Sequence, residues 1–283
     1  MGIMEKLSEL EDFDLVIDAR RTEFHYWRDL WRYRGLFYFL SWRDVLVRYK
    51  QTAFGIAWAV LQPFLTMIVF TVVFGRLAKL PSGNVPYPVM VFAALLPWQF
   101  FANAFTASSN SLVSNANMVS KIYFPRLIIP ASAVVVGFVD FMVSCVILAG
   151  MMIWYGFAPG WHILILPMFV LMTFFAAMGA GLLVSAMNVK YRDFRYVVPF
   201  IVQLGLYISP VGFSSSIVPA RWRFLYSMNP MVGIIDGFRW AILGGNAKFQ
   251  YQGSVFSLAV VALLLLAGIL YFRRAERGFA DII

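Results

Sequence analysis

The chain has 283 residues, of which 61% are hydrophobic and only 13% charged. Soluble globular domains contain about 45–50% apolar and about 25% charged residues, so this composition excludes an ordinary water-soluble fold. The formal net charge is +9, but the basic residues are spread over short segments, which argues against a nucleic-acid-binding domain. The single cysteine, Cys145, excludes an intrachain disulfide. We therefore expect an all-α integral membrane protein.

The chain begins with residues 1–35, an acidic, aromatic-rich segment that we expect to form a cytoplasmic extension without an assigned role. Residues 36–53 are predicted to form an amphipathic helix that lies in the membrane interface. Asp44 and Arg48 stand at i, i+4 and are expected to pair on it. The helix is interpreted either as a simple membrane anchor or as a gate or docking element. One face carries Tyr38, Trp42, Val45 and Tyr49, and another carries Arg43, Asp44, Arg48 and Lys50.

Six apolar stretches are long enough to cross a bilayer, because roughly 20 apolar residues in a helix span a hydrocarbon core about 30 Å thick. They are residues 54–74, 87–108, 127–155, 161–187, 196–213 and 254–272. The segment 214–253 is interrupted by charges and by Pro219, Asn229 and Pro230. Irregular backbone at membrane depth is tolerated only where protein or water covers it, so we expect a pair of short re-entrant or interfacial helices there.

Positive charge predicts the orientation. With the N-terminus inside, 17 of the 23 Lys and Arg residues lie on the cytoplasmic side and 6 on the other. Since cytoplasmic loops carry an excess of Lys and Arg, both termini are predicted to face the cytoplasm.

Several kinds of chemistry are missing from the sequence. No Gly-Lys dipeptide occurs, which excludes a phosphate loop for ATP. His25 and His162 are placed on opposite sides of the membrane, so neither a metal site nor a catalytic residue is predicted. Asp140 is the acidic residue well inside a span, with Ser144 one turn later. We interpret it as a hydrogen-bonded structural residue or as a functional switch. Such sparse internal charge argues against ion-coupled transport.

An aromatic stripe follows the fifth span. Tyr196, Phe200, Gln203 and Tyr207 recur at spacings of 4, 3 and 4, and Trp58 lies in the first span. Aromatic faces stack on sugar rings and amides bind sugar hydroxyls, so this stripe suits a carbohydrate path. Ordinary helix packing explains it equally well.

Several short motifs follow one another along the chain. They are Trp42-Arg43-Asp44 and Arg48-Tyr49-Lys50, then 115–126 (NANMVSKIYFPR), 188–195 (NVKYRDFR), Ser209-Pro210, Asn229-Pro230-Met231 and 276–283 (ERGFADII). Over residues 36–283 the chain resembles permease subunits of ABC-2 type polysaccharide exporters, which export lipid-linked O-antigen. Teichoic acid and capsule exporters are relatives of that family.

The resemblance implies a transmembrane domain at 54–272 and a cytoplasmic tail at 273–283, in a homodimer of the bacterial inner membrane. Two copies of a separate nucleotide-binding subunit would bind ATP and Mg, so this chain would hold no cofactor and would not be an enzyme. The substrate would be a lipid-linked polysaccharide, most simply O-antigen. Teichoic acid, capsule, a small lipid or a drug are alternatives, and an ATP-independent secondary transporter or channel is a further one.

The resemblance also implies roles for individual residues. A coupling helix at about 114–126 would dock on the ATPase, with contacts from Asn115, Asn117, Lys121, Ile122, Tyr123, Phe124, Pro125 and Arg126. A cytoplasmic gate would include Tyr38, Trp42, Arg43, Arg48 and Tyr49. The polysaccharide path between the two protomers would be lined by Trp58, Tyr196, Phe200, Gln203 and Tyr207. Re-entrant helices would cap the exit with Asn229, Pro230, Asp236 and Arg239, the last two of which either gate or pair with each other.

Overall fold

The computed structural model describes residues 23–50, 55–81, 85–244 and 251–279. Throughout these ranges every regular element is a helix. The predicted all-α class is therefore confirmed.

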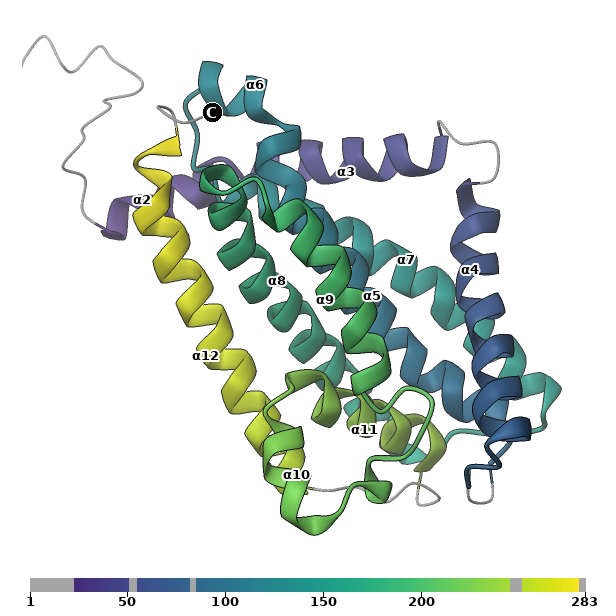
Figure 1. Cartoon of the computed structure of the whole chain (residues 1–283). Coiled ribbons are helices and arrows are strands. Elements are labelled where there is room, and N and C mark those ends of the chain that lie inside the picture. Colours follow the sequence, from purple (N-terminus) through teal and green to yellow (C-terminus); the bar gives the residue numbers. More distant parts are fainter. Residues whose placement is uncertain (1–22, 51–54, 82–84, 245–250, 280–283) are drawn as a thin grey trace, which may run out of the picture.

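Five helical segments are long and apolar enough to cross a membrane (Figure 1). They are α4 (Gly55–Phe70) with its π-helical continuation η2 (Thr71–Leu77), α5 (Tyr87–Ser114), α7 (Ile128–Trp154), α8 (Leu166–Lys190) with the preceding 3-10 turn η3 (Trp161–Ile165), and α12 (Tyr251–Glu276). Five of the six predicted spans thus have their expected length.

The sixth expected span, at 196–213, is shorter than predicted. It is α9 (Phe194–Ile208), with 15 residues. At about 1.5 Å per residue, such a helix reaches about 22 Å, less than the hydrocarbon thickness of about 30 Å. The helix ends because Ser209 is extended and Pro210 cannot continue the hydrogen-bonded ladder.

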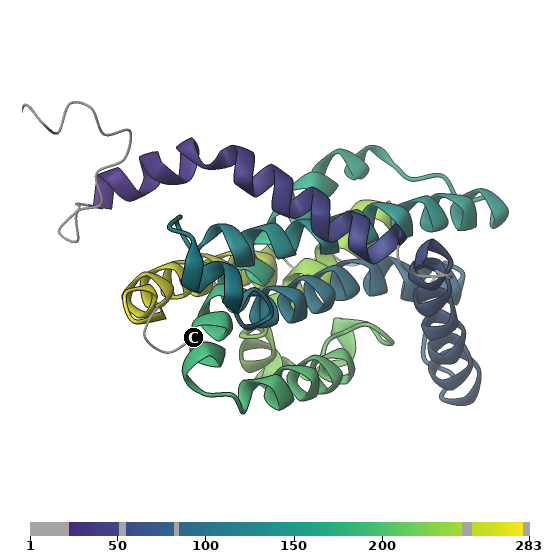
Figure 2. The ribbon, with the colours of Figure 1, turned by 90° about the horizontal axis from the view of Figure 1, so that it is seen from above.

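Short helices cover the two ends of the bundle. α2 (Glu23–Arg32) and α3 (Arg34–Lys50) lie across one end, beside α6 (Ala116–Lys121); we call this the α3 end (Figure 1). Seen from above, α2 and α3 form a long rod along one edge of the bundle that reaches α4 (Figure 2). At the opposite α11 end lie η4 (Ser215–Ile217), α10 (Ala220–Ser227) and α11 (Pro230–Leu243).

The predicted interfacial helix at 36–53 therefore starts earlier, at Arg34, and α2 precedes it within the segment expected to be a simple extension. Residues 51–53 lie outside the described residues. The helices expected within 214–253 are present as α10 and α11, whereas residues 245–250 are not described.

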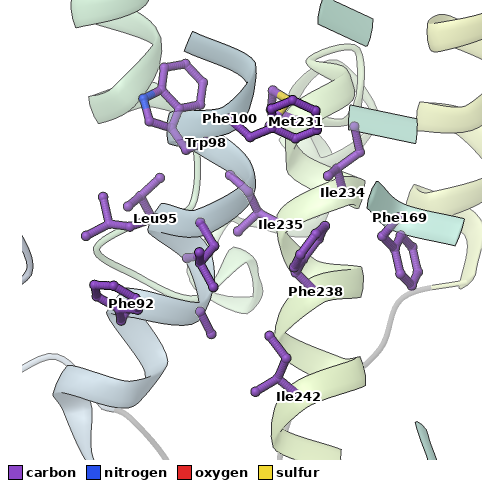
Figure 3. Close-up of a cluster of buried hydrophobic side chains, with 14 of the residues drawn as sticks. Phe92, Leu95, Trp98, Phe100, Phe169, Met231, Ile234, Ile235, Phe238 and Ile242 are labelled. Carbon is purple, nitrogen blue, oxygen red and sulfur yellow. The ribbon is translucent and has the colours of Figure 1, made fainter. Parts of the chain in front are cut away.

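The core is built around α5. Its residues from Val89 to Leu96 are all at most 5% exposed. Phe92, Leu95 and Phe100 of α5 belong to one buried cluster with Ile235 and Phe238 of α11, and Phe100 lies beside Met231 of that helix (Figure 3). α11 is thus buried by protein, which explains how a segment broken by Asn229 and Pro230 is accommodated at this end.

Close contacts between small residues hold the spans together. A Cβ added to Gly268 of α12 would lie 2.3 Å from the carbonyl oxygen of Gly179 on α8. The two backbones therefore touch at this crossing. Lipid tails are as apolar as side chains, so packing of this kind is a main source of association between spans.

Candidate functional site

The segment between α5 and α7 has an exposed tip and a buried base. Asn117 and Lys121 of α6 are exposed, and Ile122 and Tyr123 are 59% and 51% exposed. Val119 is only 2% exposed and fixes the short helix to the bundle. The exposed tip is therefore an apolar pair beside polar side chains at the α3 end.

Phe124 departs from its expected role as an anchor in a partner's pocket. Its side chain is 4% exposed and packs in a cluster of this chain's own residues with Leu40, Leu112 and Phe272. Pro125 is also buried. The chain becomes extended after α6 and turns back toward α7, which directs Phe124 inward. Of the predicted apolar contacts, Ile122 and Tyr123 remain available to a partner.

Arg126 also binds within the chain. Its backbone N–H donates to Glu276 Oε1 at 2.8 Å, and its Nη1 donates to the Glu276 carbonyl oxygen at 2.5 Å. The buried Tyr26 side chain of α2 lies near enough to Glu276 to be affected by its charge, but its hydroxyl makes no hydrogen bond within the described part of the chain. Arg273 stacks over the Tyr26 ring, 4.1 Å from its centroid. We call Tyr26, Arg126 and Glu276 the inner clamp, because they join α2, the start of α7 and the end of α12.

Tyr26 is a neutral phenol in this clamp. Burial, reinforced by the charge of Glu276, raises the pKa of Tyr26 well above its ordinary value. The phenol therefore keeps its proton at neutral pH. The sequence pointed to the tail motif 276–283 but not to Tyr26, which lies about 250 positions earlier in the chain.

The expected pairing of Asp44 with Arg48 on α3 is wrong. Arg43 pairs with Asp44 instead, with Nη2 at 2.7 Å from Oδ1. The same Nη2 donates to Asn115 Oδ1 at 3.1 Å, which ties α3 to the segment that carries α6. Arg48 turns to Asp140, whose carboxylate is 6% exposed and has less water to solvate it than the partly exposed Asp44.

Asp140 on α7 has two partners from the last turn of α3. Arg48 Nη2 lies 2.6 Å from Asp140 Oδ2, and the Tyr49 hydroxyl donates to Asp140 Oδ1. Burial, followed by this carboxylate, raises the pKa of Tyr49, so its hydroxyl stays protonated. Ser144 donates to the Asp140 backbone carbonyl at 3.0 Å rather than to the carboxylate. The interpretation of Asp140 as a hydrogen-bonded residue agrees with these contacts. The sequence did not indicate that its partners would be Arg48 and Tyr49.

The residues expected to form the cytoplasmic gate thus divide into two groups. Arg43, Arg48 and Tyr49 contact other elements of the chain. Tyr38 and Trp42 are 70% and 53% exposed on the outer face of α3. Large aromatic side chains on an exposed helix face at this position fit the boundary between lipid and water.

The predicted path residues are exposed on the single chain. On α9, Tyr196, Phe200 and Tyr207 are 82%, 64% and 58% exposed, and Gln203 is exposed too. Trp58 of α4 is 58% exposed. The structure thus places the α9 stripe on an open face of the bundle.

The other face of α9 packs against α5. Val198 is fully buried, and a Cβ at Gly205 would lie 2.5 Å from the ring of Trp98. Tyr207 stacks on Phe70 at the end of α4, with ring centroids 6.3 Å apart. α9 therefore turns its small residues inward and its aromatic and amide side chains outward, and its aromatic stripe meets α4.

At the α11 end, Arg239 donates to three backbone carbonyls. It is 5% exposed and reaches Val211 and Phe213 at 2.7 Å each, and Met90 at 3.3 Å. Asp236 and Arg239 attract each other electrostatically, but no ion pair within 4.0 Å joins them among the described residues, so the interpretation in which they pair directly is not supported.

Asn229 and two tyrosines hold the same stretch of backbone. Asn229 caps α11 by accepting from the Met231 N–H at 3.0 Å, and it donates to Ser209 Oγ at 2.9 Å, while Pro230 occupies the first helical position. Tyr226 donates to the Ile208 carbonyl at 2.9 Å, and Tyr87 to that of Gly212. The outer clamp is the set of side chains around residues 208–213, namely Tyr87, Tyr226, Asn229 and Arg239.

Comparison with known proteins decides the family. The profile of the ABC-2 type transporter family matches residues 35–243 of this chain. The chain belongs to the ABC-2 type transporter family. It is therefore a multi-pass permease of the inner membrane and a transporter subunit. In the described residues no three His, Cys, Asp or Glu side chains gather as a metal site would require.

Individual relatives share most of this ABC-2 permease's length. An O-antigen export system permease protein RfbA of Myxococcus xanthus is 27% identical over 257 residues, covering 90% of this chain and 97% of the relative. One from Klebsiella pneumoniae is 26% identical over 245 residues, covering 85% and 92%. The polysialic acid transport protein KpsM of Escherichia coli is 20% identical over 239 residues, covering 83% and 91%.

Proposed function

We propose that this ABC-2 permease exports a lipid-linked polysaccharide of the O-antigen class across the inner membrane, driven by a separate ATPase subunit. The observation that carries this proposal is that relatives named O-antigen export permease extend over 85–90% of the chain. A phosphate loop is absent from the sequence, which is consistent with ATP and Mg being bound by the partner. ABC-2 permeases of polysaccharide exporters work with ATPase subunits.

The exposed face of α9 supports a carbohydrate substrate. Tyr196, Phe200 and Tyr207 offer ring faces for stacking on sugars, and Gln203 offers a donor and an acceptor for hydroxyl groups. In the proposal, two copies of the chain bring their α4 and α9 faces together, and the polymer passes between them. The α3 end then faces the cytoplasm, and Ile122 and Tyr123 enter a groove of the ATPase.

The proposal is tested by export in cells that lack the chromosomal copy of this chain. Replacing Tyr196, Phe200 and Tyr207 together by alanine removes the stacking surface, so surface polysaccharide should fall by roughly tenfold or more, taking about 0.5–1.5 kcal/mol for each ring, the magnitude of an aromatic stacking pair. Trp161→Ala is the matched control, because Trp161 is 69% exposed in η3, which packs against α8 and α11 rather than on the α4 and α9 faces. Normal polysaccharide export by the triple variant, with altered export of small lipids or drugs, contradicts the proposal.

A further inference from the structure

Asp140 is a buried carboxylate that joins two helices distant in the sequence. It lies twelve residues after the start of α7, and its partners Arg48 and Tyr49 are the third- and second-last residues of α3. The ion pair and the hydrogen bond occupy both oxygens of the carboxylate. α3 and α7 contact each other, and α7 runs beneath α3 (Figure 1).

We call the contacts of Asp140 with Arg48 and Tyr49 the joint. It lies between the segment that carries α6 and the first span. α3 ends at Lys50 and α4 begins at Gly55, so the joint lies directly before the first span, which carries Trp58. α7 begins at Ile128, two residues after Arg126 of the inner clamp. α7 is therefore the element that connects the segment carrying α6 to the corner between α3 and α4.

The ion pair in this joint keeps α3 and α7 in a fixed relative position when either helix moves. Separating Arg48 from Asp140 would leave a carboxylate unpaired at a site that is 6% exposed, and an uncompensated buried charge is strongly unfavourable. Apolar packing of equal stability would allow α3 to slide on α7, because apolar contacts have no preferred direction. An ion pair reinforced by a phenol hydrogen bond does not allow α3 to slide on α7.

We propose that Asp140 is a positioning residue that fixes the end of α3 to α7, so that displacement of segment 114–126 is passed along α7 to the entrance of the first span. This inference rests on the proposed function, in which an ATPase displaces that segment. The contact between Arg43 and Asn115 also ties α3 directly to segment 114–126.

The decisive quantity is polysaccharide exported per ATP hydrolysed by the complete complex. Asp140→Asn removes the charge, and the double variant Asp140→Asn with Arg48→Gln removes both charges, so no unpaired ion remains to unfold the protein. With the joint lost, ATP hydrolysis should stay within about twofold of wild type while export falls roughly tenfold, within the range of energetic coupling between linked sites. Ser144→Ala is the control, since Ser144 contacts only the Asp140 backbone carbonyl.

Normal export per ATP in the double variant overturns the inference. So does a loss of export that merely follows the amount of protein in the membrane, since that is the result of a structural role. If the wild-type complex exports no polysaccharide, the proposed function fails instead, and the joint is then judged by a measurement that needs no substrate.

That measurement is the distance between spin labels at Val47→Cys on α3 and Val146→Cys on α7, in a Cys145→Ser background. Both sites are exposed, at 48% and 73%. Labelled chain is diluted with unlabelled chain, and the complex is compared without nucleotide and with trapped ATP. The inference predicts one unchanged distance in both states and a changed distance in the neutral double variant. A change in the wild-type complex contradicts it.

Discussion

The two ends of the bundle are held by polar contacts of different kinds. At the α11 end, Arg239 donates to backbone carbonyls of residues 90, 211 and 213. At the α3 end, side chains bind side chains across separate elements, as Arg48 does with Asp140 and Arg43 with Asn115. In the described part of the chain the Val211 and Phe213 carbonyls have no other donor, whereas paired side chains can be exchanged or neutralised. We therefore expect the α11 end to stay fixed and the α3 end to transmit motion.

The largest effect on stability is expected from Arg239→Met. It leaves the carbonyls of Val211 and the partly buried Phe213 without their donor, at a cost of about 1–3 kcal/mol for an unsatisfied buried group, whereas the Met90 carbonyl belongs to the hydrogen-bond ladder of α5. We expect most of the protein to lose its folded state in detergent, measured by thermal unfolding and size-exclusion profile. Arg221→Ala is the control, since Arg221 is exposed on α10. A fully stable Arg239→Met variant would show that the two ends do not differ in this way.

A smaller effect is expected from Glu276→Gln in the inner clamp. The amide still accepts the Arg126 N–H hydrogen bond but loses the charge that lies beside Arg126 and Arg273, so we expect a loss of about 1–2 kcal/mol, part of the about 1.5–3 kcal/mol of a hydrogen bond to a charged group. Thermal unfolding measures it, with the exposed Arg277→Ala as control. A drop as large as that of Arg239→Met would remove the distinction between the ends.

No loss of stability is expected from Ile122→Ala with Tyr123→Ala, because both side chains are more than half exposed. Export should nevertheless fall by tenfold or more, since truncating two apolar anchors at an interface costs about 2 kcal/mol or more. Co-purification of the ATPase subunit and export are the measurements, with Ser120→Ala as the exposed neighbour. If export and co-purification remain normal, the tip of this segment does not dock on the ATPase.

The sequence predicts the spans well because their signal is local. Length and apolar content alone locate α4, α5, α7, α8 and α12. α9 was predicted too long, because the apolar run continues through Val211 and Phe213 while Pro210 has already ended the helix. The aromatic spacing on α9 correctly places Tyr196, Phe200 and Tyr207 on one exposed face.

The partners of charged residues could not be predicted in the same way. Arg48 had an acceptable local partner in Asp44, and Asp140, 92 positions away, carries no signal that names it. Likewise an aromatic residue such as Phe124 fits a partner's pocket and the chain's own core equally well, and only the direction of the backbone after α6 distinguishes them. Long-range contacts and side-chain direction are properties of the fold.

ATP-dependent export by the reconstituted complex tests the central claim most directly. Proteoliposomes contain this chain with its ATPase subunit, and lipid-linked polysaccharide is supplied on the side of the ATPase. The account predicts movement to the opposite side with ATP and Mg, and none when the ATPase is omitted. Movement of the polymer by this chain alone, without ATP, would contradict it.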